Sequence, residues 1–211
     1  MINRMKLILS ITVMILFFTY SCVQKKGVSN LTIFPVLLGD YLEQKKPDSI
    51  SVIFAPEVIS TGYHEQNVAF SSDGKELYFT MSVPFQTYNV IMFMKKENNQ
   101  WTRPRVAPFS GRYSDIDPFI SPDRKRLYFV SNRPLEGTGK PKEDHDIWVV
   151  QRTETGWAEP ENLGSPVNSD KDEFYVSVTA NGTIYFSSGR AGGKGSWDIY
   201  RSILVDKHYT E

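Results

Sequence analysis

A repeat with a period of about 50 residues is the feature that most constrains the fold of this chain. The repeat is clearest in an aromatic tripeptide, which occurs as Leu77–Phe79, Leu127–Phe129 and Ile184–Phe186. A short turn precedes each tripeptide, at Ser72–Gly74, Pro122–Arg124 and Ala180–Gly182. Glycine ends two of these turns because it tolerates left-handed backbone, so Arg124 predicts a strained turn or another turn type. Repeats of this length are typical of solenoids and propellers.

Each copy carries the pattern of four short strands. An apolar strand precedes the turn, at 68–70, 118–120 and 175–178, and the tripeptide lies in the second strand. A third strand begins at Val90, Asp146 and Asp198, and a hairpin then leads to a fourth strand, which opens at Trp101 and Trp157. Alternating strands rich in aromatic and β-branched residues indicate half-buried sheets. The pattern predicts an all-β fold of four-stranded antiparallel β-propeller blades, at about 64–104, 115–160 and 172–211.

The repeats resemble the WD40-like (TolB-like) β-propeller repeat lipoprotein family. The residues that carry the resemblance are Phe70–Phe79, Ser121–Phe129 and Asp146–Trp148, and the likeness covers roughly residues 53 to 211. It implies a six-bladed parent, of which this chain holds about three blades. It implies little about activity, because one fold hosts many functions.

The N-terminus has the pattern of a targeting segment. Arg4 and Lys6 are followed by the apolar run Leu7–Phe18, which is short for a membrane span. Thr19–Cys22 resembles a bacterial lipobox, so we expect a signal peptide at 1–21 and lipidation of Cys22, the single cysteine. This predicts a lipid-anchored, extracytoplasmic protein of the bacterial cell envelope, periplasmic or at the outer membrane. The alternatives are an uncleaved anchor, or an ordinary secretory signal with an incidental cysteine.

Residues 22–51 are interpreted as a tether, although the apolar stretch Leu31–Leu38, broken by Pro35, could also pack on the side of the propeller. Residues 53–56 are interpreted as an orphan outer strand, because Ile53–Pro56 has the spacing of Trp101–Pro104. Three blades are too few to close a ring, since propellers have about four to eight. Two interpretations follow: the chain is a fragment, or two copies assemble into one ring as a homodimer.

The charges balance, with 24 basic and 24 acidic residues. Removing the leader takes away Arg4 and Lys6, which leaves 22 against 24 and a net charge of −2. This balance argues against a nucleic-acid partner held by bulk electrostatics.

Polar residues recur where the innermost strands begin and where the second strands end. The candidate ligand-binding residues are His64, Glu65, Asp115, Asp117, Asp172, Glu173, Arg133 and Arg190. The acidic residues are expected to ring the channel mouth and bind a cation, sugar or peptide, or else to cap strand ends. The arginines are expected to bind a carboxylate or phosphate, or to pair with Asp146 or Asp198 within their own blades. His145 and His208, like His64, are expected to be surface residues, since their spacing predicts no metal site.

These observations favour a non-catalytic binding or scaffolding protein with an envelope protein or carbohydrate as partner. No catalytic residue and no cofactor are predicted. The enzymatic alternative is a glycan-active hydrolase that uses two of the carboxylates at the mouth. The third alternative is a truncated, non-functional remnant.

Overall fold

The computed structural model describes residues 34–83, 88–136, 139–206 and 208–210. The expected signal peptide and Cys22 lie outside these residues. The strands belong to one compact unit that begins at Val36. The fold is all-β and built of four-stranded antiparallel sheets, as the repeat predicts for a partial β-propeller. The described part of the chain contains no helix that is long and apolar enough to cross a membrane.

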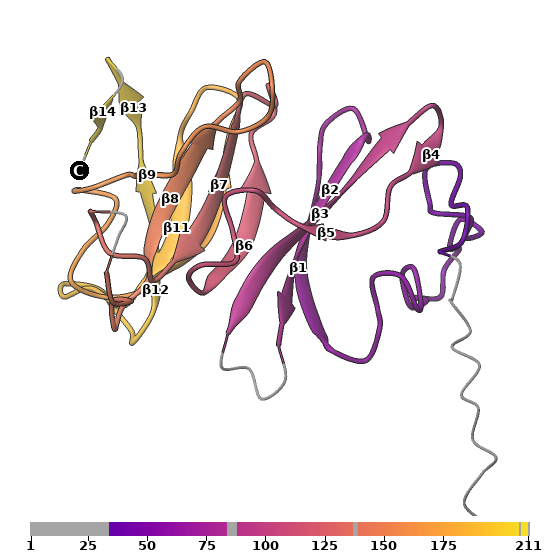
Figure 1. The fold of residues 1–211 in the computed structure, drawn as a ribbon. Helices are drawn as coiled ribbons and strands as arrows, with labels where there is room; N and C mark the ends of the chain where they lie inside the picture. Colours follow the sequence, from indigo (N-terminus) through magenta and orange to yellow (C-terminus); the bar gives the residue numbers. More distant parts are fainter. Residues whose placement is uncertain (1–33, 84–87, 137–138, 207, 211) are drawn as a thin grey trace, which may run out of the picture. The chain divides into compact units, whose positions relative to one another are not determined.

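The sheets follow the repeats (Figure 1): blade 1 has five strands, blade 2 has four, and blade 3 has three, with its last two strands paired in a separate hairpin. Blade 1 contains β1 (His64–Phe70), β2 (Glu76–Ser82), β3 (Asn89–Glu97), β4 (Gln100–Trp101) and β5 (Arg105–Val106). Blade 2 contains β6 (Asp115–Ile120), β7 (Arg126–Ser131), β8 (Asp146–Gln151) and β9 (Glu161–Asn162). Blade 3 contains β10 (Glu173–Val178), β11 (Ile184–Ser188) and β12 (Asp198–Ser202), followed by the hairpin of β13 (Leu204–Val205) and β14 (His208–Tyr209).

In blade 1 the expected fourth strand at Trp101 is β4, and β5 follows it as a further strand; in blade 2 the fourth strand, β9, lies later than its expected start at Trp157. Trp101 and Trp157 pair with the end of the preceding strand, at Lys96 and Arg152. The strands that extend the sheets, β5 and β9, follow the prolines of these segments and pair with the middle of β3 and β8. The tryptophans therefore close a hairpin, and the chain crosses to the outer edge of the blade after it.

A bulge interrupts the innermost strand of every blade. The register shifts between Gln66 and Ala69, between Ile116 and Phe119, and between Phe174 and Ser177. At the same position of each bulge, Asn67, Asp117 and Tyr175 have φ values of 53°, 53° and 54°. These residues adopt the left-handed conformation that is uncommon outside glycine. The bulge is thus a repeated feature of the fold.

The blades pack face to face through the alternate residues of their strands. Between blades 1 and 2, Tyr78 and Ile91 pack against a cluster that includes Leu127, Phe129 and Trp148. The opposite face of blade 2 contributes Tyr128 and Ile147 to a second cluster. There they pack against Val178, Ile184 and Phe186 of blade 3. Period-2 alternation gives blade 2 two apolar faces, and both are covered.

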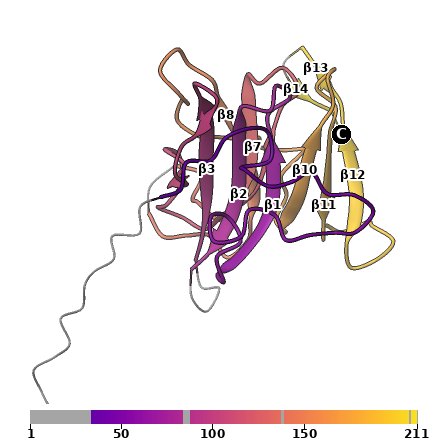
Figure 2. The same cartoon turned by 90° about the vertical axis from the view of Figure 1, so that its right-hand side faces the viewer.

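Residues 36–60, here called the N-terminal cap, cover the free face of blade 1 (Figure 2). Leu37 and Ile59 are buried, and the backbone N–H of Trp101 donates a 2.9 Å hydrogen bond to the carbonyl of Leu37. The chain from residue 36 therefore packs on the propeller, which the sequence left open for Leu31–Leu38, and is not a free tether. Residues 53–56 form no strand of a sheet; Pro56 makes only an isolated bridge with Ser60. An outer strand needs a third strand beside it, and the described chain supplies none there.

The cap reproduces contacts that blade 1 makes with blade 2. Lys96 pairs with Asp40 of the cap at 2.7 Å, where the equivalent Arg152 pairs with Glu76 of blade 1. The indole Nε1–H of Trp101 donates to the carbonyl of Gly39 at 2.8 Å. The indole of the equivalent Trp157 donates to the hydroxyl of Tyr78 at 3.2 Å. The cap thus occupies the position of a preceding blade.

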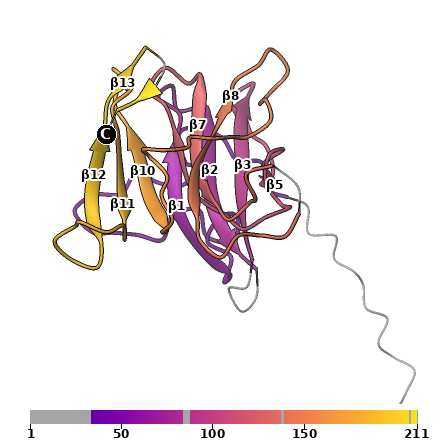
Figure 3. The same ribbon diagram turned by 90° about the vertical axis from the view of Figure 1, so that its left-hand side faces the viewer.

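None of the described residues covers the other end face, on blade 3, in this way. Figure 3 shows β12 at the outer edge of this sheet, next to β11. Tyr185 is 37% exposed and Ile199 is 79% exposed. The residues equivalent to Tyr185 are Tyr78 and Tyr128, and those equivalent to Ile199 are Ile91 and Ile147. All four are at most 1% exposed.

Candidate functional site

Asp115 and Arg133 form a buried ion pair inside blade 2. Arg133 Nη2 lies 2.8 Å from Asp115 Oδ1, and the Ser110 hydroxyl donates to Asp115 Oδ2 at 2.8 Å. The guanidinium lies over the rings of Phe129 and Trp148, 4.9 and 5.3 Å from their centres. The side chain of Asp115 is fully buried and that of Arg133 almost so. Burial of both charges is compatible with folding because each is paired and hydrogen-bonded.

Glu173 and Arg190 repeat this arrangement in blade 3. Arg190 Nη2 lies 3.0 Å from Glu173 Oε1, and the Ser169 hydroxyl donates to the same oxygen at 2.6 Å. The guanidinium lies over Phe186 and Tyr200, 5.1 and 4.9 Å from their ring centres. The side chain of Glu173 is fully buried.

The expected partners of the two arginines, Asp146 and Asp198, are wrong. The first residue of each innermost strand pairs with the last residue of the second strand, Asp115 with Ser131 and Glu173 with Ser188. Each arginine follows that serine by two residues, so its side chain folds back onto the innermost strand. Asp146 instead pairs with Lys142 at 2.5 Å, and Asp198 accepts backbone hydrogen bonds from Lys194 and Gly195.

In blade 1 the equivalent carboxylate, Glu65, is half-buried. Its Oε1 accepts hydrogen bonds from the backbone N–H of Thr61 at 3.1 Å and from the Thr61 hydroxyl at 2.5 Å. His64 precedes it at the start of β1, is exposed, and pairs through its backbone position with Ser82. Glu65 is thus more accessible than Asp115 and Glu173.

Asp117 links neighbouring blades. Its backbone N–H donates to the hydroxyl of Thr80 in blade 1 at 3.1 Å, and its Oδ2 accepts from the backbone N–H of Tyr175 in blade 3 at 2.9 Å. Burial raises the pKa of Asp117, and the Tyr175 N–H and the nearby His145 offset only part of that rise. Asp117 therefore works as a connector at the bulge.

Asp172 holds the long loop of blade 2 against blade 3. Its Oδ1 accepts from the backbone N–H of His145 at 2.8 Å and lies 2.9 Å from His145 Nδ1. The imidazole also packs on Phe174, with ring centres 5.4 Å apart. The expectation that His145 is a plain surface residue is wrong, because it connects two blades.

The eight candidate residues are distributed over separate contacts. Within the described residues, no hydrogen bond or ion pair joins the Asp115–Arg133 pair to the Glu173–Arg190 pair. A ligand reaches Asp115 or Glu173 only by displacing its arginine, which is buried in the case of Arg133 and partly buried in the case of Arg190. The described residues also contain no group of three or more His, Cys, Asp or Glu side chains placed to hold a metal ion. The ligand-binding role of these residues stays a prediction, and the structure assigns Asp115, Asp117 and Glu173 to internal contacts.

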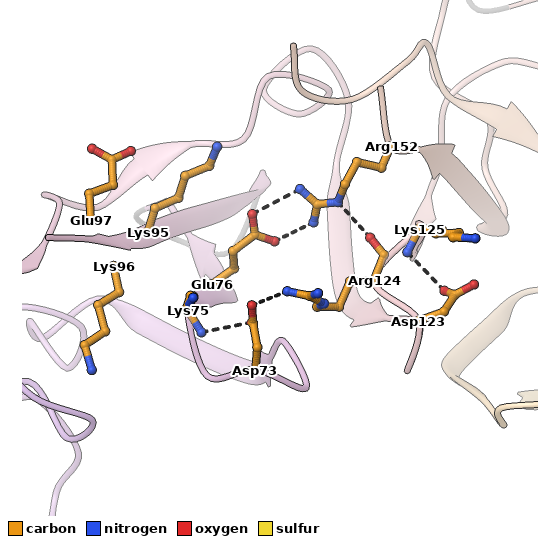
Figure 4. Close-up of a pocket in the computed structure, with 10 residues that line it drawn as sticks. All are labelled: Asp73, Lys75, Glu76, Lys95, Lys96, Glu97, Asp123, Arg124, Lys125 and Arg152. Carbon is orange, nitrogen blue, oxygen red and sulfur yellow. Dashed lines mark hydrogen bonds and ion pairs between the residues drawn. The ribbon is translucent and has the colours of Figure 1, made fainter. Parts of the chain in front are cut away.

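A cavity that was not anticipated from the sequence lies between the turns of blades 1 and 2, with a volume of about 370 Å³. We call it the charged pocket, because every lining residue is ionisable (Figure 4). The lining residues are Asp73, Lys75, Glu76, Lys95, Lys96, Glu97, Asp123, Arg124, Lys125 and Arg152. The sequence signal that could have revealed this pocket is the alignment of the turns of blades 1 and 2, where acidic and basic residues recur at matching positions.

Figure 4 shows Glu76 and Arg152 paired among the eight other lining side chains. Arg152 Nη1 and Nη2 donate to the two carboxylate oxygens of Glu76 at 3.1 and 2.5 Å, and Nε donates to the carbonyl of Arg124 at 2.7 Å. The guanidinium also lies 4.1 Å above the centre of the Trp157 ring. Arg124 forms an ion pair with Asp73 across the two blades. The bidentate pair with Glu76 and the stacking on Trp157 hold the Arg152 guanidinium in one position in the pocket.

The two turns that form the pocket share one geometry. Arg124 has a φ of 62° and Gly74 a φ of 66°, and each donates its backbone N–H to the serine three residues earlier. The turn at Arg124 is therefore of the same type as the glycine turn and places a non-glycine residue in the left-handed region. The hydroxyl of Ser121 and the backbone N–H of Lys125 lower the pKa of Asp123, so this carboxylate is ionised near neutral pH.

No family model matches the chain, and no curated protein matches it. Among solved structures, it is similar to TolB from Acinetobacter baumannii, with 17% identity and a TM-score of 0.45 over 70% of this chain and 31% of that one. It is also similar to an alpha-L-arabinofuranosidase from Lactobacillus brevis, with 17% identity and a TM-score of 0.44 over 69% of this chain and 51% of that one. A structure of a prolyl endopeptidase gives 14% identity and a TM-score of 0.38 over 68% and 20%. All three are β-propeller proteins, and this chain spans about a third, a half and a fifth of their lengths.

Proposed function

We propose that this chain is a non-catalytic binding or scaffolding lipoprotein of the cell envelope, anchored through Cys22 and facing an extracytoplasmic compartment. The basic residues, the apolar run and the Thr19–Cys22 sequence at the N-terminus support the anchor. The uncovered face of blade 3 is the surface through which it docks. The observation that carries this proposal is the exposure of Tyr185 and Ile199 at positions that a neighbouring blade buries elsewhere in the chain.

The chemistry of the partner follows from what covers the equivalent residues. Tyr78 and Ile91 lie under aliphatic and aromatic side chains of blade 2, and Tyr128 and Ile147 lie under those of blade 3. The matching partner for blade 3 is therefore another sheet face that carries aliphatic and aromatic side chains. Trp197, half exposed beside Ile199, adds further apolar surface. Exposed apolar side chains that a neighbouring blade buries elsewhere in the fold are typical of interaction sites.

A second copy of this chain is the partner that fits best. The first-blade face of a second copy is covered by its own N-terminal cap, so closing a ring of two copies requires the cap to leave blade 1. The free face of a second copy is its own blade 3. Two such faces pack as equivalents around a twofold axis, the commonest symmetry of homodimers.

The test is the solution mass of the purified protein by size-exclusion chromatography with light scattering. The unmodified chain is expected to be a dimer, and Ile199→Glu a monomer, because a carboxylate at the centre of the interface would be buried without a partner. Leu135→Glu is the matched control: Leu135 is also exposed but lies in a loop, and its variant should remain a dimer.

Circular dichroism on the same peaks checks that each variant keeps its β-sheet content. An unmodified chain that stays monomeric at all concentrations, or an Ile199→Glu variant that stays dimeric, contradicts docking through blade 3. A poorly folded monomer would instead favour the remnant interpretation.

The hydrolase alternative is less well supported. Paired-carboxylate hydrolysis needs two carboxyl groups that face one substrate, roughly 5 to 9.5 Å apart. Asp115 and Glu173 are buried beneath their own arginines, and Asp117 is used between blades. A screen of the protein on a panel of glycans tests this alternative, and turnover that is lost in Glu65→Ala would establish it.

A further inference from the structure

Among the described residues, the equivalent junction between blades 2 and 3 does not repeat the charged lining of this pocket, so the fold does not require it. In blade 3, Asn181 and Gly182 occupy the turn positions of Asp123 and Arg124; Gly182 donates its N–H to Thr179 as Arg124 does to Ser121. Leu204 occupies the position of Arg152, because it pairs with Tyr209 as Arg152 pairs with Trp157. A feature needed for blade packing would recur at both junctions.

Arg124 is held in an unfavourable backbone conformation at this pocket. Its φ of 62° lies in the left-handed region, where glycine stands in the other two copies. Residues kept in such conformations cluster at ligand sites, because the surrounding structure must compensate for the strain. Arg124 therefore brings a guanidinium to the pocket at a position where glycine would suit the backbone better.

The pocket carries a surplus of positive charge. Six of its side chains are cationic and four are anionic, which gives a net charge of +2. Glu76 is neutralised by Arg152 and Asp73 by Arg124, while Lys96 pairs with Asp40. Among the described residues, the ammonium groups of Lys75, Lys95 and Lys125 take part in no ion pair. The mature chain, by contrast, has the net charge of −2 counted above.

We propose that the charged pocket binds a phosphate group carried by a larger molecule. Lysine ammonium groups attract a phosphate as mobile point charges, and the Arg124 guanidinium offers a planar donor set beside them. The volume of about 370 Å³ exceeds that of a phosphate alone and falls in the range of small-molecule sites. The phosphate source is either a soluble phosphate ester or a phospholipid headgroup, and the experiment separates the two.

The soluble arm titrates the purified protein with inorganic phosphate and follows the backbone amide signals of residues 71–75 and 121–125 by NMR. Saturable shifts confined to these turns are expected. Lys95→Gln with Lys125→Gln brings the net charge of the pocket from +2 to 0 and should weaken binding about tenfold. Arg124→Gly should also weaken binding while leaving the melting temperature unchanged or higher, because glycine suits this turn.

The membrane arm uses the Cys22→Ala protein, which cannot be lipidated, with vesicles of phosphatidylcholine that contain or lack phosphatidylglycerol. Binding only to the anionic vesicles, lost in the double lysine variant, assigns the phosphate to a lipid headgroup. Saturable binding of inorganic phosphate without vesicle binding assigns it to a soluble ligand.

The matched control is Lys140→Gln with Lys171→Gln, which removes the same charge from exposed positions outside the pocket. This variant should bind phosphate and vesicles as the unmodified protein does. Equal losses in the pocket variant and the control, or no binding in either arm, overturn the proposal. Both outcomes are independent of docking through blade 3.

Discussion

The backbone N–H of Tyr175 donates a 2.9 Å hydrogen bond to Oδ2 of Asp117 and so joins the innermost strands of blades 3 and 2. The N–H of Asp117 in turn donates to Thr80 of blade 1 at 3.1 Å. One bulge residue therefore connects three consecutive blades. Its left-handed φ of 53° is what lets its N–H and its carboxylate serve two different neighbours.

Replacing Asp117 by alanine should destabilise the protein by about 1–3 kcal/mol, because the partly buried N–H of Tyr175 loses its acceptor. Urea unfolding followed by circular dichroism measures the change. Asp117→Asn is the matched control, since asparagine keeps an acceptor oxygen and tolerates left-handed backbone. An alanine variant as stable as the asparagine variant would show that this hydrogen bond contributes nothing.

The raised pKa of Asp117 predicts the sign of a pH dependence. Burial is the main cause of the rise, so the folded protein holds the Asp117 proton more tightly than the unfolded chain does. The stability that Asp117 contributes is then fully present below the ordinary aspartate pKa of about 3.9 and falls as the pH rises through that value toward the raised pKa. The measurement is the difference in unfolding free energy between the unmodified protein and Asp117→Asn, followed from acidic to neutral pH. The difference should favour the unmodified protein most at the acidic end, and a constant difference would contradict the prediction.

The blades were predictable from the sequence because Leu77–Phe79 recurs in two further copies, each between a turn and a third strand. The bulges were not, since nothing local marks Tyr175 as left-handed. The partners of Arg133 and Arg190 lie 18 and 17 residues away, so they depend on strand register, which the pattern did not specify. The N-terminal cap was missed because it belongs to no repeat.

The buried ion pair in blade 2 predicts a large loss of stability on Arg133→Met. The substitution leaves Asp115 buried without its counter-charge, which typically costs about 3–5 kcal/mol. The double variant Arg133→Met with Asp115→Leu should recover much of this loss, since both charges are then absent. Urea unfolding measures both variants.

The comparison variant for this pair is Lys171→Met, which removes an exposed ion pair with Asp170 and should give no measurable change. If Arg133→Met proved as mild as Lys171→Met, the Asp115 carboxylate would have to reach solvent or another partner. The pair would then not be the buried structural contact described above.

The N-terminal cap predicts different effects for two neighbouring leucines. Leu37 is 5% exposed against blade 1, and Leu38 is 41% exposed. Leu37→Ala should cost about 2–5 kcal/mol, because it opens a cavity under the cap, whereas Leu38→Ala should cost far less. Thermal unfolding of both variants provides the comparison. If the two variants melt at the same temperature as the unmodified protein, residues 36–51 behave as the tether expected from the sequence, and the first-blade face becomes available to a second copy.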